Sequence, residues 1–179
     1  TRSNRVARFL VHSAPSFPTA EKPHYKKQFI DKGVSPSVHS PTLVELSSGN
    51  LLAVWYGGSR EGSRDVRLYR SVFDRQTGLW GDVTPLTGPE ETQSDLNRYI
   101  RKIGNPSLVR DLSRKIWLFY VTVSMGGWSG GSISYRTSTE DGAHFSSAKR
   151  LVTSPFFNVS TLVRTAPFLY EDGTIGLPV

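Results

Sequence analysis

Residues able to bind an anion, transfer a proton or stack on a ring gather in a few short segments of the chain. The segment YGGSREGSRD contains cations and carboxylates, SMGGWSGGS places a tryptophan among glycines, and three further segments each precede a proline. The candidates are Arg60, Glu61 and Asp65 in the first segment, Trp128 in the second, and His39, Arg101, Lys102, Asn105, Asn158 and Arg164 before the prolines. Cations beside carboxylates and an aromatic ring are typical of a pocket for an anionic small molecule or a sugar.

The same residues also have structural explanations, which the sequence leaves open. Arg60 and Glu61 could form a surface ion pair, and Asp65 could cap a turn at the start of a strand. His39 could be a half-buried histidine with satisfied hydrogen bonds, and Trp128 could pack between structural units.

Several common chemistries lack their motifs. The chain has no cysteine, no H-E-x-x-H spacing, no phosphate-binding loop and no G-x-S-x-G elbow. We therefore expect no metal and no cofactor, and neither serine-triad nor nucleotide-hydrolysing chemistry. The net charge of +7 suits an acidic ligand, although a solvated basic surface is the alternative. Because the basic residues are scattered and no nucleic-acid motif occurs, we expect no nucleic-acid partner.

An internal repeat indicates the elements that must position the candidates. PTLVELSSGNLLAVWY from Pro41 and PSLVRDLSRKIWLFYV from Pro106 superimpose without a gap, at an offset of 106 − 41 = 65 residues. Both predict a hairpin with a Ser-rich turn, and a third copy, PFLYEDGTIGLPV, begins at Pro167. The segments YRS and YRT recur after the first two hairpins, so each repeat predicts four short strands. Apolar alternation without a long helical period makes the chain all-β.

Alternating strand direction sorts the connections onto two faces. The loop after the second strand and the segment before the first strand lie on one face, and these connections carry the candidates. We therefore expect the candidate side chains to converge, and the turn STEDGAHF to lie on the opposite face.

This turn, Ser138 to Phe145, resembles the Asp-box S-x-D-x-G-x-x-W of BNR repeats in sialidases, with Phe145 in the Trp position and Glu140 in the Asp position. Five further segments of the chain occur in the order seen in the sialidase-like "predicted neuraminidase" group. They are HSPTLVELSSGNLLAVWYGGSREGSRDV, RKIGNPSL, GGWSG, SPFFNVSTLVRTAP and GLPV.

The resemblance implies a six-bladed β-propeller, of which this chain is a fragment of roughly three blades; a β-sandwich is the structural alternative. Residues 1–33 are then an N-terminal extension with a lead-in strand, and residues 34–179 a partial propeller.

The resemblance also implies a glycoside hydrolase, an exo-α-sialidase (neuraminidase) that hydrolyses terminal sialic acid or a related acidic sugar from glycans. Sialidases bind the sugar carboxylate with an arginine triad, use an Asp as acid/base and attack with a Tyr. Carried over to this sequence, carboxylate binding falls to Arg60, Arg101 and Arg164, proton transfer to Asp65 or Glu61, and shaping of the pocket to Trp128 and Asn105.

His39 stands where the first arginine of the triad lies in many sialidases, so a uronate remains an alternative sugar. The Tyr and its activating Glu are expected outside this chain. A non-catalytic glycan-binding propeller is one alternative function, and a polysaccharide lyase or hydrolase acting on uronate-containing glycans is the other, with His39 as the base of a lyase.

The compartment stays open, although a secreted or periplasmic location is favoured. No apolar run has the length of a signal peptide or a membrane span, and a leader could have been removed before Thr1. Asn158 lies in N-V-S, a glycosylation sequon that has meaning only on a secretory route.

Overall fold

The computed structural model describes residues 7–11, 25–30, 33–139, 141–156, 158 and 160–179. The elements in this part of the chain are β1 (Ser37–Glu45), β2 (Leu51–Gly58), β3 (Arg67–Asp74), β4 (Leu79–Trp80), β5 (Thr84–Thr87), α1 (Pro89–Leu96), β6 (Lys102–Arg110), β7 (Ile116–Val123), η1 (Trp128–Gly130, a 3-10 helix), β8 (Gly131–Ser138), β9 (Lys149–Arg150), β10 (Phe168–Leu169) and β11 (Ile175–Gly176). Within these ranges, neither helix has the length and hydropathy needed to cross a bilayer.

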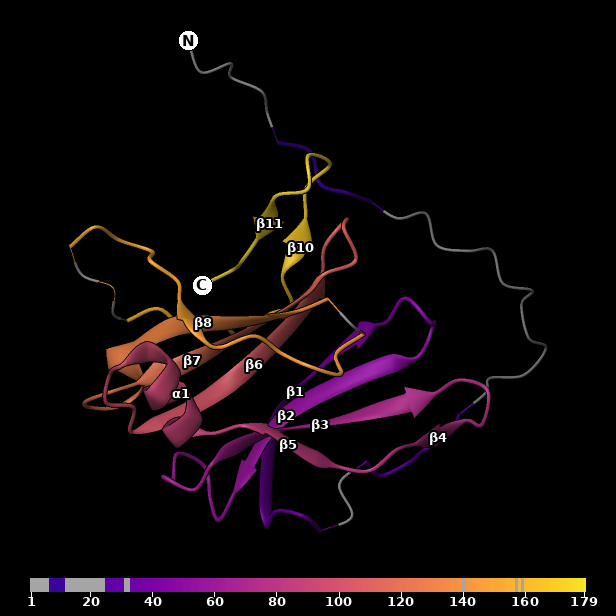
Figure 1. Ribbon diagram of the computed structural model, residues 1–179, viewed down its shortest axis with the longest axis horizontal. Helices are drawn as coiled ribbons and strands as arrows, with labels where there is room; N and C mark the ends of the chain where they lie inside the picture. Colours follow the sequence, from indigo (N-terminus) through magenta and orange to yellow (C-terminus); the bar gives the residue numbers. More distant parts are fainter. Residues whose placement is uncertain (1–6, 12–24, 31–32, 140, 157, 159) are drawn as a thin grey trace.

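The strands of the described residues form three antiparallel sheets (Figure 1). The first sheet has the order β1-β2-β3-β4, with β5 also paired to β3, the second has the order β6-β7-β8-β9, and β10 pairs with β11 in the third. Strands that follow one another in the chain therefore lie side by side, as expected for each repeat. The prediction of a chain built mainly from hairpin-paired strands is confirmed, with the α1 helix as an exception to the all-β expectation.

The two complete sheets repeat one another in register. Leu43 pairs with Ala53 in the first hairpin, and the residues 65 positions later, Leu108 and Leu118, pair in the second. The turns also correspond, since the amide of Leu46 donates to the carbonyl of Asn50 at 2.8 Å and the amide of Asp111 donates to that of Lys115 at 2.9 Å. The repeat read from the sequence is thus a repeat of hydrogen-bonded hairpins.

Two apolar layers hold the sheets together. The layer between the first and second sheets contains Leu52 and Leu68 on one side and Leu118 and Tyr120 on the other, all fully buried. The second layer lies between the second sheet and the β10–β11 hairpin, and it includes Val109, Phe119, Ile133 and Val163, with Ile175 packed against them. Successive residues of a strand point to opposite faces, so β7 contributes to both layers.

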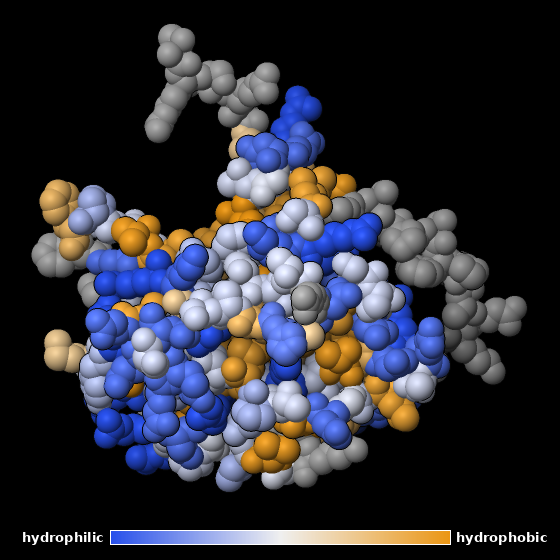
Figure 2. All heavy atoms as spheres, in the orientation of Figure 1, coloured by the Kyte–Doolittle hydropathy of each residue, from blue (hydrophilic) through white to orange (hydrophobic). Residues whose placement is uncertain are grey.

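Figure 2 shows where hydrophilic and apolar residues gather on one face of the molecule. Hydrophilic residues cover the side of the molecule that carries α1, and apolar residues gather around the β10–β11 hairpin. The hairpin adds few strand residues of its own, and several apolar side chains beside it are only partly buried, among them Trp117, Leu169 and Ile175.

The short helix α1 was not predicted from the sequence, because eight residues are too few to display a helical period. Its start nevertheless has recognisable signals: Pro89 is the first helical residue, and two glutamates occupy the first turn. The Glu91 carboxylate accepts a hydrogen bond from the Gly88 amide at 3.0 Å and pairs with Arg67 of β3. These contacts fix the beginning of the helix against the first sheet.

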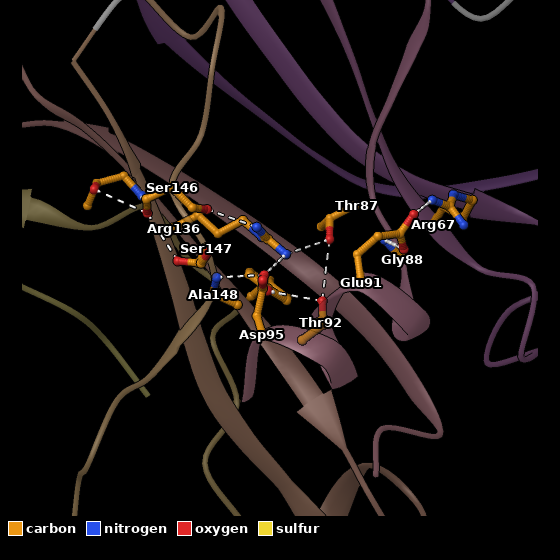
Figure 3. A network of polar contacts seen from close by, with 12 residues as sticks. Arg67, Thr87, Gly88, Glu91, Thr92, Asp95, Arg136, Ser146, Ser147 and Ala148 are labelled. Carbon is orange, nitrogen blue, oxygen red and sulfur yellow. Dashed lines mark hydrogen bonds and ion pairs between the residues drawn. The ribbon is translucent and has the colours of Figure 1, made fainter. Parts of the chain in front are cut away.

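A buried ion pair fixes the other end of α1 to the second sheet (Figure 3). Nη2 of Arg136 in β8 lies 2.6 Å from Oδ2 of Asp95 and also donates to the Thr87 hydroxyl at 2.9 Å. Asp95 Oδ2 accepts a second hydrogen bond, from the Ala148 amide, at 2.8 Å. Arg136 Nη1 donates to the Ser146 carbonyl at 2.8 Å. The helix thereby links the end of β5 to the connection between β8 and β9.

The acidic turn after β8 packs against the first sheet. The Asp141 carboxylate accepts a hydrogen bond from the Ser47 amide, in the β1–β2 turn, at 3.0 Å. Gly142 has a φ of 74°, and a Cβ there would lie 2.7 Å from Leu52 Cδ2, so the position requires glycine. Phe145 packs against the first apolar layer. Glu140 lies outside the described residues.

Candidate functional site

A cavity of about 360 Å³ lies between the first two sheets and the segment that leads to β10. It is lined by His39, Ser40, Pro41, Tyr56, Glu61, Asn105, Pro106, Trp128, Val163 and Arg164. Five of the candidates from the sequence are among these residues: His39, Glu61, Asn105, Trp128 and Arg164. The volume falls within the range of small-molecule sites.

Matching bulges in β1 and β6 shape one wall of the cavity. The pairing register shifts between His39 and Thr42 in β1, and between Gly104 and Ser107 in β6. The residue before each proline, Ser40 or Asn105, has a φ of 47°. A bulge leaves one residue unpaired and redirects its side chain. Both residues line the cavity, and the Ser40 hydroxyl lies 3.4 Å from Asn105 Oδ1, to which it donates.

A histidine, a tyrosine and a glutamate form a contiguous group inside the cavity. His39 and Tyr56 pair across β1 and β2, with their rings stacked at a centroid distance of 5.5 Å and an angle of 22°. The Tyr56 hydroxyl donates to Glu61 Oε1 at 3.3 Å, and His39 Nε2 shares a hydrogen bond of 3.0 Å with the Ser37 hydroxyl. Burial, together with the adjacent Glu61 charge, raises the pKa of Tyr56 to about 12, so its phenol keeps its proton at neutral pH.

The Trp128 ring forms another side of the cavity, and the Lys102 cation lies over this ring. Lys102 Nζ lies 4.1 Å from the ring centroid of Trp128, within cation–π distance. A Cβ on Gly104 would lie 2.7 Å from Trp128 Cη2, so the absence of a side chain at Gly104 lets the indole occupy this place. Burial and the nearby Arg101 charge lower the pKa of Lys102, while Glu61 acts in the opposite direction.

Asp65 and Arg60, two candidates in the β2–β3 loop, do not line the cavity and form hydrogen bonds within the loop. The Asp65 carboxylate accepts hydrogen bonds from the Ser59 amide at 2.8 Å and from the Ser59 hydroxyl at 3.0 Å. These bonds hold the pKa of Asp65 below its usual value. Arg60 Nε donates to the Ser63 hydroxyl at 3.3 Å. The geometry at Asp65 matches the turn-capping alternative, because its carboxylate closes the loop that carries Glu61.

Two further candidates also lie elsewhere. Arg101 lines a neighbouring hollow, although Lys102, the next residue, lies beside Trp128. Asn158 braces its own segment: its Oδ1 accepts from the Thr153 amide at 2.8 Å, and its Nδ2 donates to the Leu151 carbonyl at 2.7 Å. The side chain of Asn158 is therefore occupied in local hydrogen bonds.

Tyr56 and Ser40 line the cavity but were not among the sequence candidates. Tyr56 belongs to the apolar run LLAVWYGG, where it resembles a core residue. Regular continuation of the pairing from Thr42 and Val54 would place Gly57 opposite His39. The bulge at Ser40 shifts the register by one residue, so that Tyr56 pairs with His39 instead. The S-P and N-P pairs at matching repeat positions were the available signal for the bulge.

The described residues contain no group of three or more His, Asp or Glu side chains arranged to hold a metal ion. The side chains that line the cavity themselves offer groups for proton transfer, hydrogen bonding and charge neutralisation. Glu61 can accept or deliver a proton, Tyr56 can donate a hydrogen bond, and Arg164 can neutralise an anion.

Comparison with known proteins identifies a family of repeat proteins to which most of the chain is similar. Residues 49–179 match the family described as "BNR repeat-like domain". No curated protein is similar enough to the chain to count as a match.

Among solved structures, the chain is similar to the Hadza microbial sialidase Hz136, with a TM-score of 0.64, 16% identity and coverage of 80% of this chain and 32% of that protein. A protein of unknown function from Dyadobacter fermentans DSM 18053 gives a TM-score of 0.56 at 11% identity, covering 77% of this chain and 45% of that one. An α-L-arabinofuranosidase from Lactobacillus brevis gives a TM-score of 0.51 at 15% identity, covering 78% and 44%. At these identities the likeness concerns the fold, and the chain spans less than half the length of each of these proteins.

Proposed function

This chain belongs to the BNR repeat-like domain family, and on that premise we propose that it forms part of a β-propeller glycoside hydrolase of the sialidase superfamily, whose substrate is a glycan ending in sialic acid or a related acidic sugar. The first two sheets are then successive blades of a six-bladed ring, and residues 34–179 contribute roughly half of it. The observation that carries the proposal is the cavity itself, which combines a carboxylate, a tyrosine, an aromatic ring and the Arg164 cation in its lining, with Lys102 over the Trp128 ring.

The cavity suits a sugar that carries a negative charge. Arg164 lines it, and Lys102 lies over the ring of Trp128. An arginine can bind a carboxylate through two parallel hydrogen bonds, and an indole can pack against the apolar face of a sugar ring. Asn105 and His39 then serve the sugar hydroxyls.

Proton transfer falls to Glu61, because its carboxylate lies in the cavity whereas that of Asp65 is bonded to Ser59. Hydrolysis of a glycoside needs a proton for the leaving oxygen and stabilisation of the positive charge that develops on the sugar ring. Tyr56 donates its proton toward Glu61 and so orients the carboxylate. The attacking nucleophile is a tyrosine outside this chain.

A pair of matched substitutions tests the assignment. Glu61→Gln keeps the size of the side chain and removes its proton chemistry, so release of 4-methylumbelliferone by the complete propeller, from its sialic acid or glucuronic acid conjugate, should fall by about 10²- to 10⁴-fold. Arg164→Ala should mainly raise KM, since it removes a binding cation. Arg75→Ala, an exposed cation near the hairpin turns, is the control and should leave both constants unchanged.

The same measurements can overturn the proposal. If the protein releases nothing from any acidic conjugate and Arg164→Ala binds N-acetylneuraminate and glucuronate as well as the wild type, the cavity is not an acidic-sugar site. Loss of activity in Asp65→Asn with full activity in Glu61→Gln would reverse the assignment of the proton donor.

The stacked His39–Tyr56 pair favours a second candidate, a lyase for uronate-containing polysaccharides. In that reaction His39 removes the proton next to the sugar carboxylate, and the Tyr56 phenol, which keeps its proton at neutral pH, protonates the leaving oxygen. A lyase product carries a new carbon–carbon double bond that absorbs in the ultraviolet. Appearance of this absorbance with a uronate polymer, and its loss in His39→Ala, would separate the lyase from the hydrolase.

A further inference from the structure

A second hollow, of about 460 Å³, is lined by residues from connections that also contribute to the cavity. It is lined by Arg64, Tyr99, Arg101, Ser124, Met125 and Gly126. It is shallower than the cavity and open to solvent. The cavity residues assigned above to proton transfer and sugar binding do not line it.

The cavity and the hollow are built from the same connections. The β2–β3 loop contributes Glu61 to the cavity and Arg64 to the hollow, and the β7–β8 loop contributes Trp128 and Met125 in the same way. The members of each pair are three residues apart in the chain, so their Cα atoms are separated by at most about 11 Å. The two spaces are therefore neighbours, close enough for one oligosaccharide to reach both.

The hollow presents cations that have no carboxylate partner among the described residues. Arg64 Nη2 donates to the Tyr99 hydroxyl at 3.0 Å, a contact that orients the guanidinium without neutralising it. Among the residues that the structure describes, neither Arg64 nor Arg101 forms an ion pair with a carboxylate. The charge of Arg101 contributes, after burial, to the lowered pKa of Lys102, which indicates that cations crowd along this edge. An anionic ligand would relieve that repulsion.

The remaining lining suits a sugar ring. Tyr99 is 49% exposed and Met125 is 79% exposed, so an aromatic and an apolar surface stand open beside the two guanidinium groups. Sugars present an apolar face as well as polar substituents, and an aromatic side chain with a polar tip can serve both. The hollow thus has the composition of a sugar site with a place for an anion.

We infer that the hollow binds a second anionic group, a carboxylate or a sulfate ester, on an acidic oligosaccharide whose terminal unit occupies the cavity. This inference rests on the proposed function and narrows its substrate class from a single acidic sugar to an acidic oligosaccharide or polysaccharide. Arg64 and Arg101 hold the second anion, and the exposed ring of Tyr99 lies against its sugar.

Calorimetric titration of the full chain with galacturonate and with trigalacturonate provides the test. Trigalacturonate should bind about tenfold more tightly than the monomer, as expected for an added charge-assisted contact near solvent. The double variant Arg64→Ala/Arg101→Ala should bind both ligands with the affinity that the wild type has for the monomer. Arg75→Ala, at the opposite end of the first sheet, should keep the wild-type difference. Because the contact is exposed, the tenfold difference should shrink as salt is raised.

Each outcome decides the matter. Equal affinity for monomer and trimer in the wild type, or a trimer advantage that survives in the double variant, overturns the inference while the proposed function stands. Absence of binding by either ligand, and by N-acetylneuraminate, overturns both. Chondroitin tetrasaccharides with and without sulfate then identify the anion: tighter binding of the sulfated form assigns a sulfate ester, and equal binding, lost in the double variant, assigns the carboxylate.

Discussion

The ion pair between Asp95 and Arg136 should make a large single contribution to stability, and Asp95→Asn tests it. The two side chains are 21% and 9% exposed, and their closest atoms lie 2.6 Å apart. The substitution keeps the shape of Asp95 but leaves the Arg136 cation almost buried, with neutral partners only. Breaking a buried pair from one side lowers the free energy of unfolding by about 3–5 kcal/mol.

We expect a value near the lower end, about 3 kcal/mol, because Asp95 keeps some contact with water and asparagine can still accept a hydrogen bond. For a chain of this length, that loss corresponds to a fall in Tm of about 6–12 °C. Urea unfolding followed by tryptophan fluorescence measures the change, with an unchanged m-value as the sign that the folded and unfolded states keep their exposed areas.

The exposed pair between Arg75 and Glu45 supplies the matched control. Its closest atoms are 3.9 Å apart, and the side chains are 57% and 53% exposed. Glu45→Gln should therefore change the free energy of unfolding by less than about 0.5 kcal/mol. Replacing both buried partners, Asp95→Leu with Arg136→Met, should destabilise less than Asp95→Asn alone, since no charge is left buried. An effect of Asp95→Asn as small as that of Glu45→Gln would refute the reasoning, because it would mean that Arg136 is hydrated.

Three further predictions follow from individual contacts. Gly104→Ala should displace the Trp128 ring, whose nearest atom would lie 2.7 Å from the new Cβ, and weaken acidic-sugar binding several-fold in a titration. Gly127→Ala, next to Trp128 in the β7–β8 connection and with open space around it, should have no such effect. Although burial pushes the pKa of Asp111 upward, hydrogen bonds from Ser and Trp side chains hold it below its ordinary 3.8. Its stabilisation is therefore present above about pH 4 and is lost as the pH falls through the folded pKa, so acid unfolding of Asp111→Asn should start from a lower stability and show a shallower pH dependence. Asp65→Ala should speed hydrogen exchange at the amide it holds, in the β2–β3 loop, and reduce sugar affinity without shifting Tm.

Much of the fold could be predicted because it is periodic. Alternating apolar residues and Ser-rich turns recur 65 residues apart, and hairpin pairing follows from local turn chemistry. The helix α1 escaped prediction because its stability comes from contacts with distant partners, Arg67 and Arg136, rather than from its own eight residues.

The sequence indicated on which face of the molecule the candidate site lies. It did not indicate which of the candidate side chains line the cavity. Strand direction alone indicates which connections share a face, and His39, Glu61, Asn105, Trp128 and Arg164 do line one cavity. The direction of a side chain within a loop depends on hydrogen bonds that the sequence does not display.

The sequence by itself determined the antiparallel repeat, the family resemblance and the face that carries the polar loops, because these depend on residue order and strand alternation. Only the tertiary structure decided that Asp65 binds Ser59, that Tyr56 faces Glu61 and that Arg101 lines the second hollow whereas Lys102 lies over the Trp128 ring. The physical reason is that bulges and loop hydrogen bonds redirect single side chains without altering the periodic pattern around them.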